Sequence, residues 1–208
     1  MKFLLDKSPI DFTRKRELYP DFIAGQLLTP LTRYKNAGLV YAIDNGAFTY
    51  FDAKGFSTLL EREKENKDQC LFVTMPDVVR SGRRTLEIWK HGRDIVGDWP
   101  LALVAQDGIE DLEIPWSELS AIFIGGGDPW KDSCAVLDIV RTAKILKKHV
   151  HVGRVNTPQR FKIFSKAGAD TCDGSGVAIY DHMLEKIIAA VSGGEEPLLF
   201  DKDSNHDG

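Results

Sequence analysis

The feature of this sequence that most constrains its fold is a regular alternation of short apolar runs with longer segments of helical spacing. The apolar runs are rich in β-branched and aromatic residues and are bounded by Gly, Pro, Asp or Asn, which is typical of buried strands. They span residues 39–44, 71–75, 101–105, 121–124 and 150–152, with weaker candidates at 3–5 and 169–172. The segments with helical spacing are 56–67, 83–96, 133–148, 157–167 and 179–192. Strands that alternate with helices predict a parallel sheet with right-handed crossovers.

Some helix ends carry their own signals. Thr157 followed by Pro158 predicts an N-cap and a first helical residue, because Thr accepts a bond from an unpaired N–H and Pro has none to satisfy. Gly168 follows the same helix, at the position where a left-handed residue commonly ends one.

Two architectures satisfy this alternation, an open doubly wound sheet and a closed (β/α) barrel. The open sheet would be favoured by a GxGxxG turn after the first strand, and the sequence has none. In a barrel, functional residues gather at the carboxyl ends of the strands, and polar residues follow strand after strand here. We therefore predict an α/β protein with one compact (β/α) TIM-type barrel over residues 1–192 and a loose polar tail at 193–208. The short length leaves open whether the eighth strand–helix unit is complete or is completed by a partner.

Composition narrows the classes of function. The 208 residues include 27 Lys+Arg and 31 Asp+Glu, a net charge of −4, so the chain lacks the global positive charge of a strongly basic nucleic-acid binder. Cys70, Cys134 and Cys172 form no CxxC pair and indicate neither a disulfide framework nor structural zinc. The N-terminal apolar run stops at Asp6, and no run is long enough to span a bilayer. We expect a cytoplasmic protein without a signal peptide or membrane partner.

Carboxylates follow four of the predicted strands. Asp44, Asp77, Asp107 and Asp173 fall at or just beyond strand ends, and Gln106 precedes Asp107. Any single Asp at such a position can instead cap a helix or shape a turn. Because parallel strands bring their carboxyl ends to one rim, the set together predicts a site for a small polar ligand.

Two histidines and a cysteine near the last strands allow more than one interpretation. His149 and His151 point the same way from a strand, which fits a metal pair but is more typical of buried or rim histidines. Cys172 beside Asp173 fits a thiol nucleophile, but without an obvious His partner a small buried side chain is the better interpretation. We predict no metal and no cofactor.

Two further features fit phosphate contacts. The glycine run at 125–127 is either a backbone cradle for phosphate or a flexible turn, and it lacks the Lys-Ser/Thr of a P-loop. Basic side chains cluster around residues 14–16, 80–93 and 144–154, where solvated helix faces explain them equally well. The candidates for nucleic-acid binding are Arg80, Arg83, Arg84 and Arg154.

The strand-end motifs, taken in order, resemble those of the tRNA-guanine transglycosylases and of their relatives that insert 7-deazaguanines into DNA. Residues 44–48 (DNGAF) are similar to the family's D-S-G-G-[FY] element, and Asp77 falls where the family places a base-reading Asp. Residues 106–108 (QDG) resemble its Q-G-G element and 124–127 (IGGG) its I-G-G element. Residues 153–158 (GRVNTP) resemble G-V-G-T-P with one extra residue, and 168–173 (GADTCD) resemble G-x-D-x-F-D. The motifs are specific as an ordered set over residues 39–176.

The resemblance implies a (β/α) barrel that exchanges a guanine for a 7-deazaguanine through a covalent glycosyl-enzyme intermediate. By motif, Asp173 would be the nucleophile and Asp44 the general acid/base for the departing and incoming bases. The substrate-binding residues would be Asp77 and Gln106 at the purine edge, Gly126 through its backbone, Phe48 stacked on the ring, and Asn45 and Gly153. The chemistry itself suits two carboxylates, because one can capture the oxocarbenium-like sugar while the other handles the proton of the base.

Departures from the family pattern bear on which nucleic acid, tRNA or DNA, is the expected substrate. Its tRNA-modifying members carry a structural zinc site of three closely spaced cysteines and a histidine near the C-terminus. Here no cysteine follows Asp173, Ala47 replaces a glycine, and residues 174–176 (GSG) differ from those after the family's nucleophile. The resemblance is therefore to the short zinc-less relatives of phages and bacteria, with DNA favoured over tRNA. A phage-encoded protein in the host cytoplasm is one such setting.

Three functions stay open at this point. The first is a guanine transglycosylase that acts on nucleic acid with a 7-deazaguanine as second substrate. The second is an N-glycosidase, in which water resolves the intermediate, and the third is a non-catalytic base- or nucleic-acid-binding barrel. Asp44 and Asp173 together favour catalysis, because a binding protein needs no second carboxylate opposite the base-reading residue. Which 7-deazaguanine is used, and whether the protein forms a homodimer or needs a partner protein, is left open.

Overall fold

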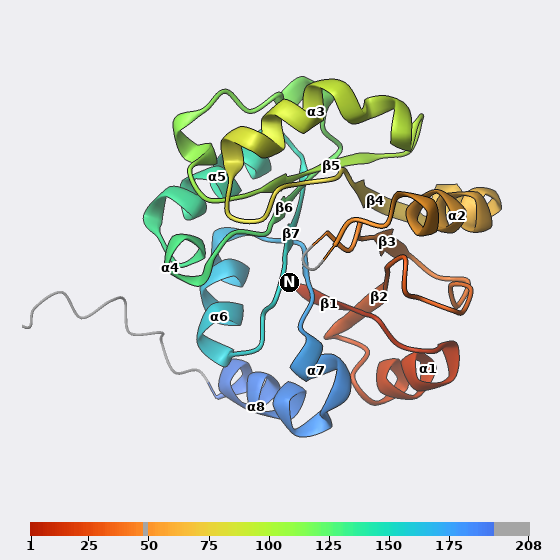
Figure 1. Ribbon diagram of the computed structural model, residues 1–208. Helices are drawn as coiled ribbons and strands as arrows, with labels where there is room; N and C mark the ends of the chain where they lie inside the picture. Colours follow the sequence, from red (N-terminus) through yellow and green to blue (C-terminus); the bar gives the residue numbers. More distant parts are fainter. Residues whose placement is uncertain (48–49, 194–208) are drawn as a thin grey trace, which may run out of the picture.

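The computed structural model describes residues 1–47 and 50–193, and these form a closed barrel of eight parallel strands (Figure 1). Each strand pairs with the next along the chain, and the last pairs with the first. The strands are β1 (Lys2–Leu5), β2 (Ile23–Leu28), β3 (Tyr41–Ile43), β4 (Cys70–Thr74), β5 (Leu101–Ala105), β6 (Ala121–Ile124), β7 (His149–Val152) and β8 (Thr171–Cys172). The predicted TIM-type barrel is confirmed.

Helices lie around the outside of the barrel (Figure 1). They are α1 (Pro9–Leu18), α2 (Ala53–Glu63), α3 (Gly82–Val96), α4 (Asp128–Lys131), α5 (Cys134–Ile145), α6 (Pro158–Ala167), α7 (Ser175–Ile179) and α8 (Asp181–Ser192). Residues 29–40 connect β2 to β3 as a loop, and the β5–β6 connection contains only the 3₁₀ turns Ile109–Asp111 and Trp116–Glu118. These abbreviated crossovers explain how the barrel closes in fewer residues than the roughly 250 typical of this fold.

The eighth strand–helix unit, which the sequence left open, is present. Strand β8 has only two residues, but it pairs with β7 on one side and with β1 on the other. Helices α7 and α8 follow it, and α8 packs against both α7 and α6. The barrel therefore closes without a partner chain.

Strand β2 has no counterpart among the predicted strands because Gly25 and Gln26 interrupt its apolar run. A Cβ at Gly25 would lie 1.9 Å from the carbonyl oxygen of Val40, so the neighbouring backbone requires glycine here. The buried Gln26 donates a 2.7 Å hydrogen bond to the Lys7 carbonyl and accepts one of 2.6 Å from the Ala37 N–H. Both residues are required by contacts with segments that are distant in sequence. A local pattern of apolar residues does not reveal such contacts.

Helix prediction succeeded where end signals and an apolar stripe coincide. The Thr157 side chain accepts a hydrogen bond from the Arg160 N–H, and Gly168 ends the helix with φ +95°, as predicted. Helix α1 was missed because Phe12 and Lys15 are its only buried residues, too few to make an apolar stripe.

Alternation of side chains along the strands divides the core in two. An outer core fills the space between barrel and helices, and an inner core fills the barrel. The inner core contains Leu4, Leu27, Ala42, Phe72, Ala102, Val104, Ala121 and Phe123. Because successive strand residues face opposite sides, Cys172 belongs to the outer core while Thr171 and Asp173 face the interior.

Within the described residues, no helix combines the length and the apolar character that crossing a bilayer requires. The predicted loose tail lies, from residue 194 onward, outside the described residues. Phe48, expected to stack on the base, lies outside them as well.

Candidate active site

A pocket of about 300 Å³ opens at the carboxyl ends of the strands. Its lining residues come in pairs from the ends of β3 to β8 and the loops that follow. They are Asp44 and Asn45, Asp77 and Val79, Val104 and Gln106, Phe123 and Gly125, Gly153 and Arg154, and Asp173 and Ser175. The volume is at the lower end of small-molecule pockets, about 300–1,000 Å³, and suits one small ring system. The tertiary structure thus gathers both predicted catalytic carboxylates and most of the predicted substrate-binding residues.

Asp44 directly follows β3, and its surroundings prepare its carboxyl group to exchange a proton. Its Oδ1 accepts hydrogen bonds from the Gly46 N–H (3.1 Å) and the Thr74 hydroxyl (3.4 Å). Gly46 has φ +72°, a left-handed conformation that glycine adopts without strain, so the chain can turn directly after this hydrogen bond. Removal from water, together with the negative charges of Asp173 and Asp77, raises the pKa of Asp44 to about 7. Near neutral pH it can therefore act as acid or base.

Asp77 presents its carboxylate between two amides. Its Oδ1 accepts a 2.9 Å hydrogen bond from Asn45, and its Oδ2 accepts one of 2.6 Å from Gln106. Gln106 is oriented in turn by the Arg80 N–H, which donates to its Oε1 at 2.8 Å. Arg80 has φ +62°, a strained conformation for a residue with a side chain. Burial raises the pKa of Asp77. The arrangement fixes a carboxylate in the wall of the pocket.

Asp173, directly after β8, has each carboxylate oxygen anchored. Oδ1 accepts a 3.1 Å hydrogen bond from the Arg154 N–H, and Oδ2 lies 3.1 Å from Nε2 of His151. Arg154 adopts φ +60°, and its N–H supports Asp173. Arg80, with φ +62°, supports Gln106 and through it Asp77, so a strained residue stands behind each of these two carboxylates. The Asp173 side chain keeps 19% of its surface exposed, which leaves it accessible from the pocket.

The glycine run at residues 125–127 forms a turn whose backbone N–H groups are engaged. The first two N–H groups donate to the Ala105 carbonyl at 2.9 and 3.1 Å, and the third donates to the Asp107 carboxylate at 2.7 Å. The turn interpretation therefore fits and the phosphate cradle does not. Asp107 shapes this turn and is not among the residues that line the pocket.

Gly126 was predicted to contact the base through its backbone, but the pocket lining includes Gly125 instead. The Gly126 carbonyl accepts a 2.6 Å hydrogen bond from the guanidinium of Arg154. A Cβ at this position would meet the ring of Trp130, so glycine is required here for packing.

The thiol and imidazole groups near the last strands are buried. Cys172 is fully buried in the outer core, and burial raises the pKa of its thiol well above the ordinary value. His151 is fully buried and His149 half-buried, and both contact the hydroxyl of Thr171. Across residues 1–47 and 50–193, no group of three His, Cys, Asp or Glu side chains is placed to hold a metal ion.

Several site residues were not predicted. Val79, Val104, Phe123 and Ser175 line the pocket. Val104 and Phe123 had a usable signal, since alternation along their strands places both toward the barrel interior. Lys131 of α4 is fully buried, and its ammonium group donates a 2.7 Å hydrogen bond to the Gly153 carbonyl. Burial, and then the charge of Arg154, lower its pKa to about 7.

The predicted nucleic-acid contacts fall in two places. Arg80, Arg83 and Arg84 are exposed in the loop and first helical turn that follow Asp77. Arg154 instead lines the pocket, where its guanidinium donates to the carbonyls of residues 125 and 126 at 2.8 and 2.6 Å. Three of the four arginines are thus free to reach a polymer outside the pocket.

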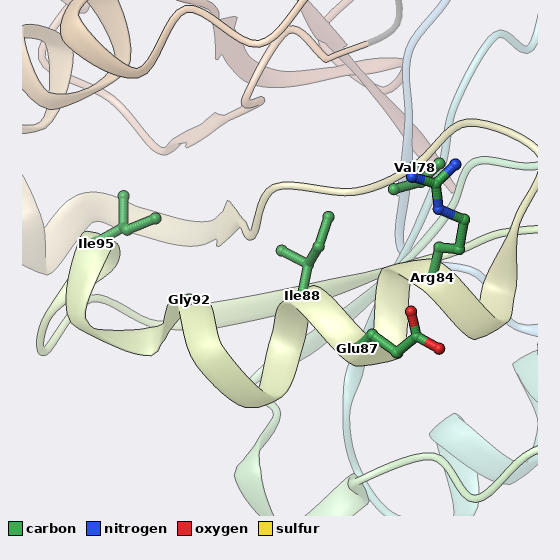
Figure 2. A pocket seen from close by; sticks show the side chains of 6 residues that line it. All are labelled: Val78, Arg84, Glu87, Ile88, Gly92 and Ile95. Carbon is green, nitrogen blue, oxygen red and sulfur yellow. The ribbon is translucent and has the colours of Figure 1, made fainter.

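A second hollow, of about 400 Å³, lies outside the barrel along α3 (Figure 2). It is lined by Val78, Arg84, Glu87, Ile88, Gly92 and Ile95. The β4–α3 loop separates the two spaces, because Asp77 and Val79 line the pocket while Val78 lines the hollow. The hollow has a single carboxylate in its wall, so the strand-end pocket with its three carboxylates is the candidate active site.

The fold and site together define an α/β barrel with a carboxylate-lined pocket at the carboxyl ends of its strands. No family model matches the chain, and no curated protein matches it significantly.

Proposed function

We propose that the protein is a base-exchange transglycosylase that replaces a guanine in nucleic acid with a 7-deazaguanine. The observation that carries this proposal is the convergence of three differently prepared carboxylates in one pocket of about 300 Å³. Asp173 is anchored at both oxygens, Asp44 has a pKa of about 7, and Asp77 is clamped by two amides. Base exchange requires a nucleophile, a general acid/base and a group that recognises the base, and these three carboxylates suit those roles in that order.

In the first half-reaction, an oxygen of Asp173 attacks C1′ of the nucleotide as the C1′–N9 bond breaks. The electron pair of that bond leaves with guanine, and protonated Asp44 gives its proton to the departing base. A covalent ester between Asp173 and the sugar results.

In the second half-reaction, the incoming 7-deazaguanine loses its N9 proton to ionised Asp44 and attacks C1′. The ester bond breaks, and its electron pair restores the Asp173 carboxylate. Asp44 returns to its protonated form, so the cycle balances without a further reactant. A pKa near 7 suits this role, since Asp44 must both give and take a proton in each turnover.

Recognition of guanine follows from the chemistry of Asp77. The Watson–Crick edge of guanine offers two neighbouring donors, N1–H and the 2-amino group, which a carboxylate can accept together. A 7-deazaguanine has the same edge and differs only on the opposite side of the ring. A pocket that reads this edge can therefore hold the departing and the incoming base in one place, with Phe123 beside the ring.

Access to a base in a polymer requires that the nucleotide leave its stack. The exposed Arg80, Arg83 and Arg84 lie immediately after the base-reading Asp77, where they can hold phosphates on either side of an extruded nucleotide. We propose DNA as the polymer, in line with the motif pattern, and the experiment includes tRNA.

The test is to incubate the protein with duplex DNA, or separately tRNA, that carries radiolabelled guanine, with and without unlabelled 7-deazaguanines. Asp173→Ala is the test variant, and Asp138→Ala, an exposed carboxylate on α5, is the matched control. We expect release of label that needs both the added base and Asp173, with Asp138→Ala equal to wild type. Release without added base would show that the reaction is hydrolysis and not exchange. Release from tRNA alone would show that tRNA, and not DNA, is the substrate. No release from either polymer would refute the proposed catalysis.

A further inference from the structure

A chain of hydrogen bonds runs through the barrel interior and ends on Asp173. Nε2 of His149 lies 2.8 Å from the Thr171 hydroxyl, and Nδ1 of His151 lies 2.9 Å from the same hydroxyl. Nε2 of His151 lies 3.1 Å from Oδ2 of Asp173. The register of β7 and β8 pairs residues 151 and 171 directly, and alternation turns all four side chains toward the interior.

The central imidazole has no access to the pocket. His151 is 0% exposed, and its ring packs against Phe72 and Phe123 at centroid distances of 5.2 and 4.6 Å. It is absent from the pocket lining, whereas Asp173 belongs to it. His151 therefore reaches the pocket only through neighbours that line it, and Asp173 is the one of these to which it is hydrogen-bonded.

The direction of each hydrogen bond follows from what the end groups can accept. An ionised Asp173 only accepts, so the nitrogen that faces it must carry a proton. In the Nε2–H tautomer of His151, Nδ1 is an acceptor that takes the Thr171 O–H, and the Thr171 oxygen accepts in turn from Nε2–H of His149. Burial lowers the pKa of His149 to about 4, so this end is uncharged at neutral pH. All three donors then point toward Asp173.

We infer that His149, Thr171 and His151 form a directed hydrogen-bond relay that fixes the Nε2–H tautomer of His151 and so orients the Asp173 carboxylate. With the Arg154 N–H on the other oxygen, the relay holds the plane of the nucleophile toward the pocket. The inference rests on the proposed function in that Asp173 is the nucleophile. Thr171 and His151 are positioning residues, because neither lines the pocket.

Charged and titratable groups lie at both ends of the relay, with Asp44 and Lys131 near Asp173. Asp173 lies at its upper end, and the two histidines lie within it. At the other end, the charges of Asp170 and Lys144 act on His149. These two residues form an ion pair in which Nζ of Lys144 lies 2.6 Å from Oδ2 of Asp170. The two aromatic rings against His151 carry no charge.

Thr171 is the position at which the relay can be interrupted with little change in volume. Thr171→Val keeps the shape of the side chain but has no hydroxyl, and Thr171→Ser keeps the hydroxyl. Without the hydroxyl, nothing holds Nδ1 of His151 as an acceptor. Asp173 is then the only hydrogen-bond partner left to the ring, and the orientation that aims Nε2–H at the carboxylate loses its second anchor.

The test uses the full chain labelled with ¹⁵N in its imidazole rings, which is tractable with 5 histidines. Long-range ¹H–¹⁵N correlation spectra report the tautomer of His151 without any activity. We expect the Nε2–H form with a hydrogen-bonded Nδ1 in the wild type and in Thr171→Ser, and in Thr171→Val an Nδ1 resonance that moves to the position of an acceptor without a donor. An Nδ1–H or doubly protonated His151 in the wild type at neutral pH would overturn the relay.

Kinetics supply the second readout. In base exchange, Thr171→Val should lower kcat on the order of 10²-fold, since small misplacement of a reacting group costs about that much, with KM for the base nearly unchanged. Thr171→Ser should restore kcat to within a few-fold. Unchanged kcat in a correctly folded Thr171→Val would overturn the inference. Absence of exchange in the wild type would refute the proposed function, and the spectra would then decide the relay alone.

Discussion

The side-chain amide of Gln106 donates a 2.6 Å hydrogen bond to Oδ2 of Asp77, across the gap between the loops that follow β5 and β4. Asn45, from the loop after β3, donates to the other oxygen. Three loops therefore converge on one carboxylate. An amide at position 77 would place its NH2 group against one of these two donors, whereas a carboxylate accepts from both.

Asp77→Asn should weaken binding of the 7-deazaguanine more than it slows chemistry. A hydrogen bond to a charged group is worth about 1.5–3 kcal/mol, so KM for the base should rise roughly 10- to 100-fold. The matched control is Asp107→Asn, on the same rim but outside the pocket lining, which should leave KM unchanged. Equal KM values for wild type and Asp77→Asn would contradict the assigned role of this residue in base recognition.

Asp44→Asn should abolish exchange and at the same time stabilise the protein above neutral pH. The pKa of Asp44 is raised from 3.8 to about 7 by folding, so the wild type loses stability as pH rises through this interval. Asn does not titrate and avoids that loss. In urea titrations, Asp44→Asn should be more stable than wild type at pH 8, and the difference should shrink toward pH 4. A difference that is constant with pH would show that burial does not perturb this carboxyl group.

Lys131→Met should change the pH dependence of stability in the alkaline range. The pKa of Lys131 falls from 10.5 to about 7 on folding, so between these values the unfolded chain binds more protons and stability rises with pH. From pH 7.5 to 9.5, the free energy of unfolding of the wild type should rise relative to Lys131→Met by at most about 1.4 kcal/mol per pH unit. Parallel profiles for the two proteins would contradict a perturbed Lys131.

Gly25→Ala should destabilise the barrel without altering any pocket residue. The new Cβ would lie 1.9 Å from the Val40 carbonyl oxygen, and that backbone belongs to the adjoining segment of the barrel. The expected loss is about 1–3 kcal/mol or more in the free energy of unfolding. Gly92→Ala on α3 is the control, because its nearest neighbour is the flexible methyl group of Met75 at 3.1 Å. A Gly25→Ala protein as stable as the wild type would rule out this close approach.

Replacing Arg83 and Arg84 together by Gln should reduce the salt dependence of nucleic-acid binding. Each phosphate contact that is lost lowers the slope of log affinity against log salt by about 0.9 for duplex DNA. The matched control is Arg141→Gln, an exposed arginine on α5 that pairs with Asp138. Fluorescence anisotropy between low and moderate salt measures the slopes, and equal slopes for the double variant and wild type would exclude these two arginines from the interface.

The alternation of apolar runs and helical segments predicted a parallel sheet, because strand and helix periodicities are local properties of the chain, and the polar strand ends favoured the closed barrel over the open sheet. The same local pattern placed Asp44, Asp77 and Asp173 at strand ends, and parallel strands bring such ends to one rim. The joint location of these carboxylates therefore followed from the sequence before any tertiary contact was known. Their roles in catalysis stay predictions.

Tertiary structure alone decided which groups prepare these carboxylates. Gln106 reaches Asp77 across 29 residues of sequence, and His151 reaches Asp173 across 22. Strand β2 was not predicted for the same reason. Gly25 is required by the close backbone of Val40, which is distant in sequence, and not by its sequence neighbours. Periodicity along a chain encodes which face a side chain takes, whereas partners and burial depend on strand register and barrel closure. That is why the positions of Asp44, Asp77 and Asp173 could be predicted from the sequence, while the raised pKa of Asp44 and the buried hydrogen-bond chain behind Asp173 appeared only in the folded protein.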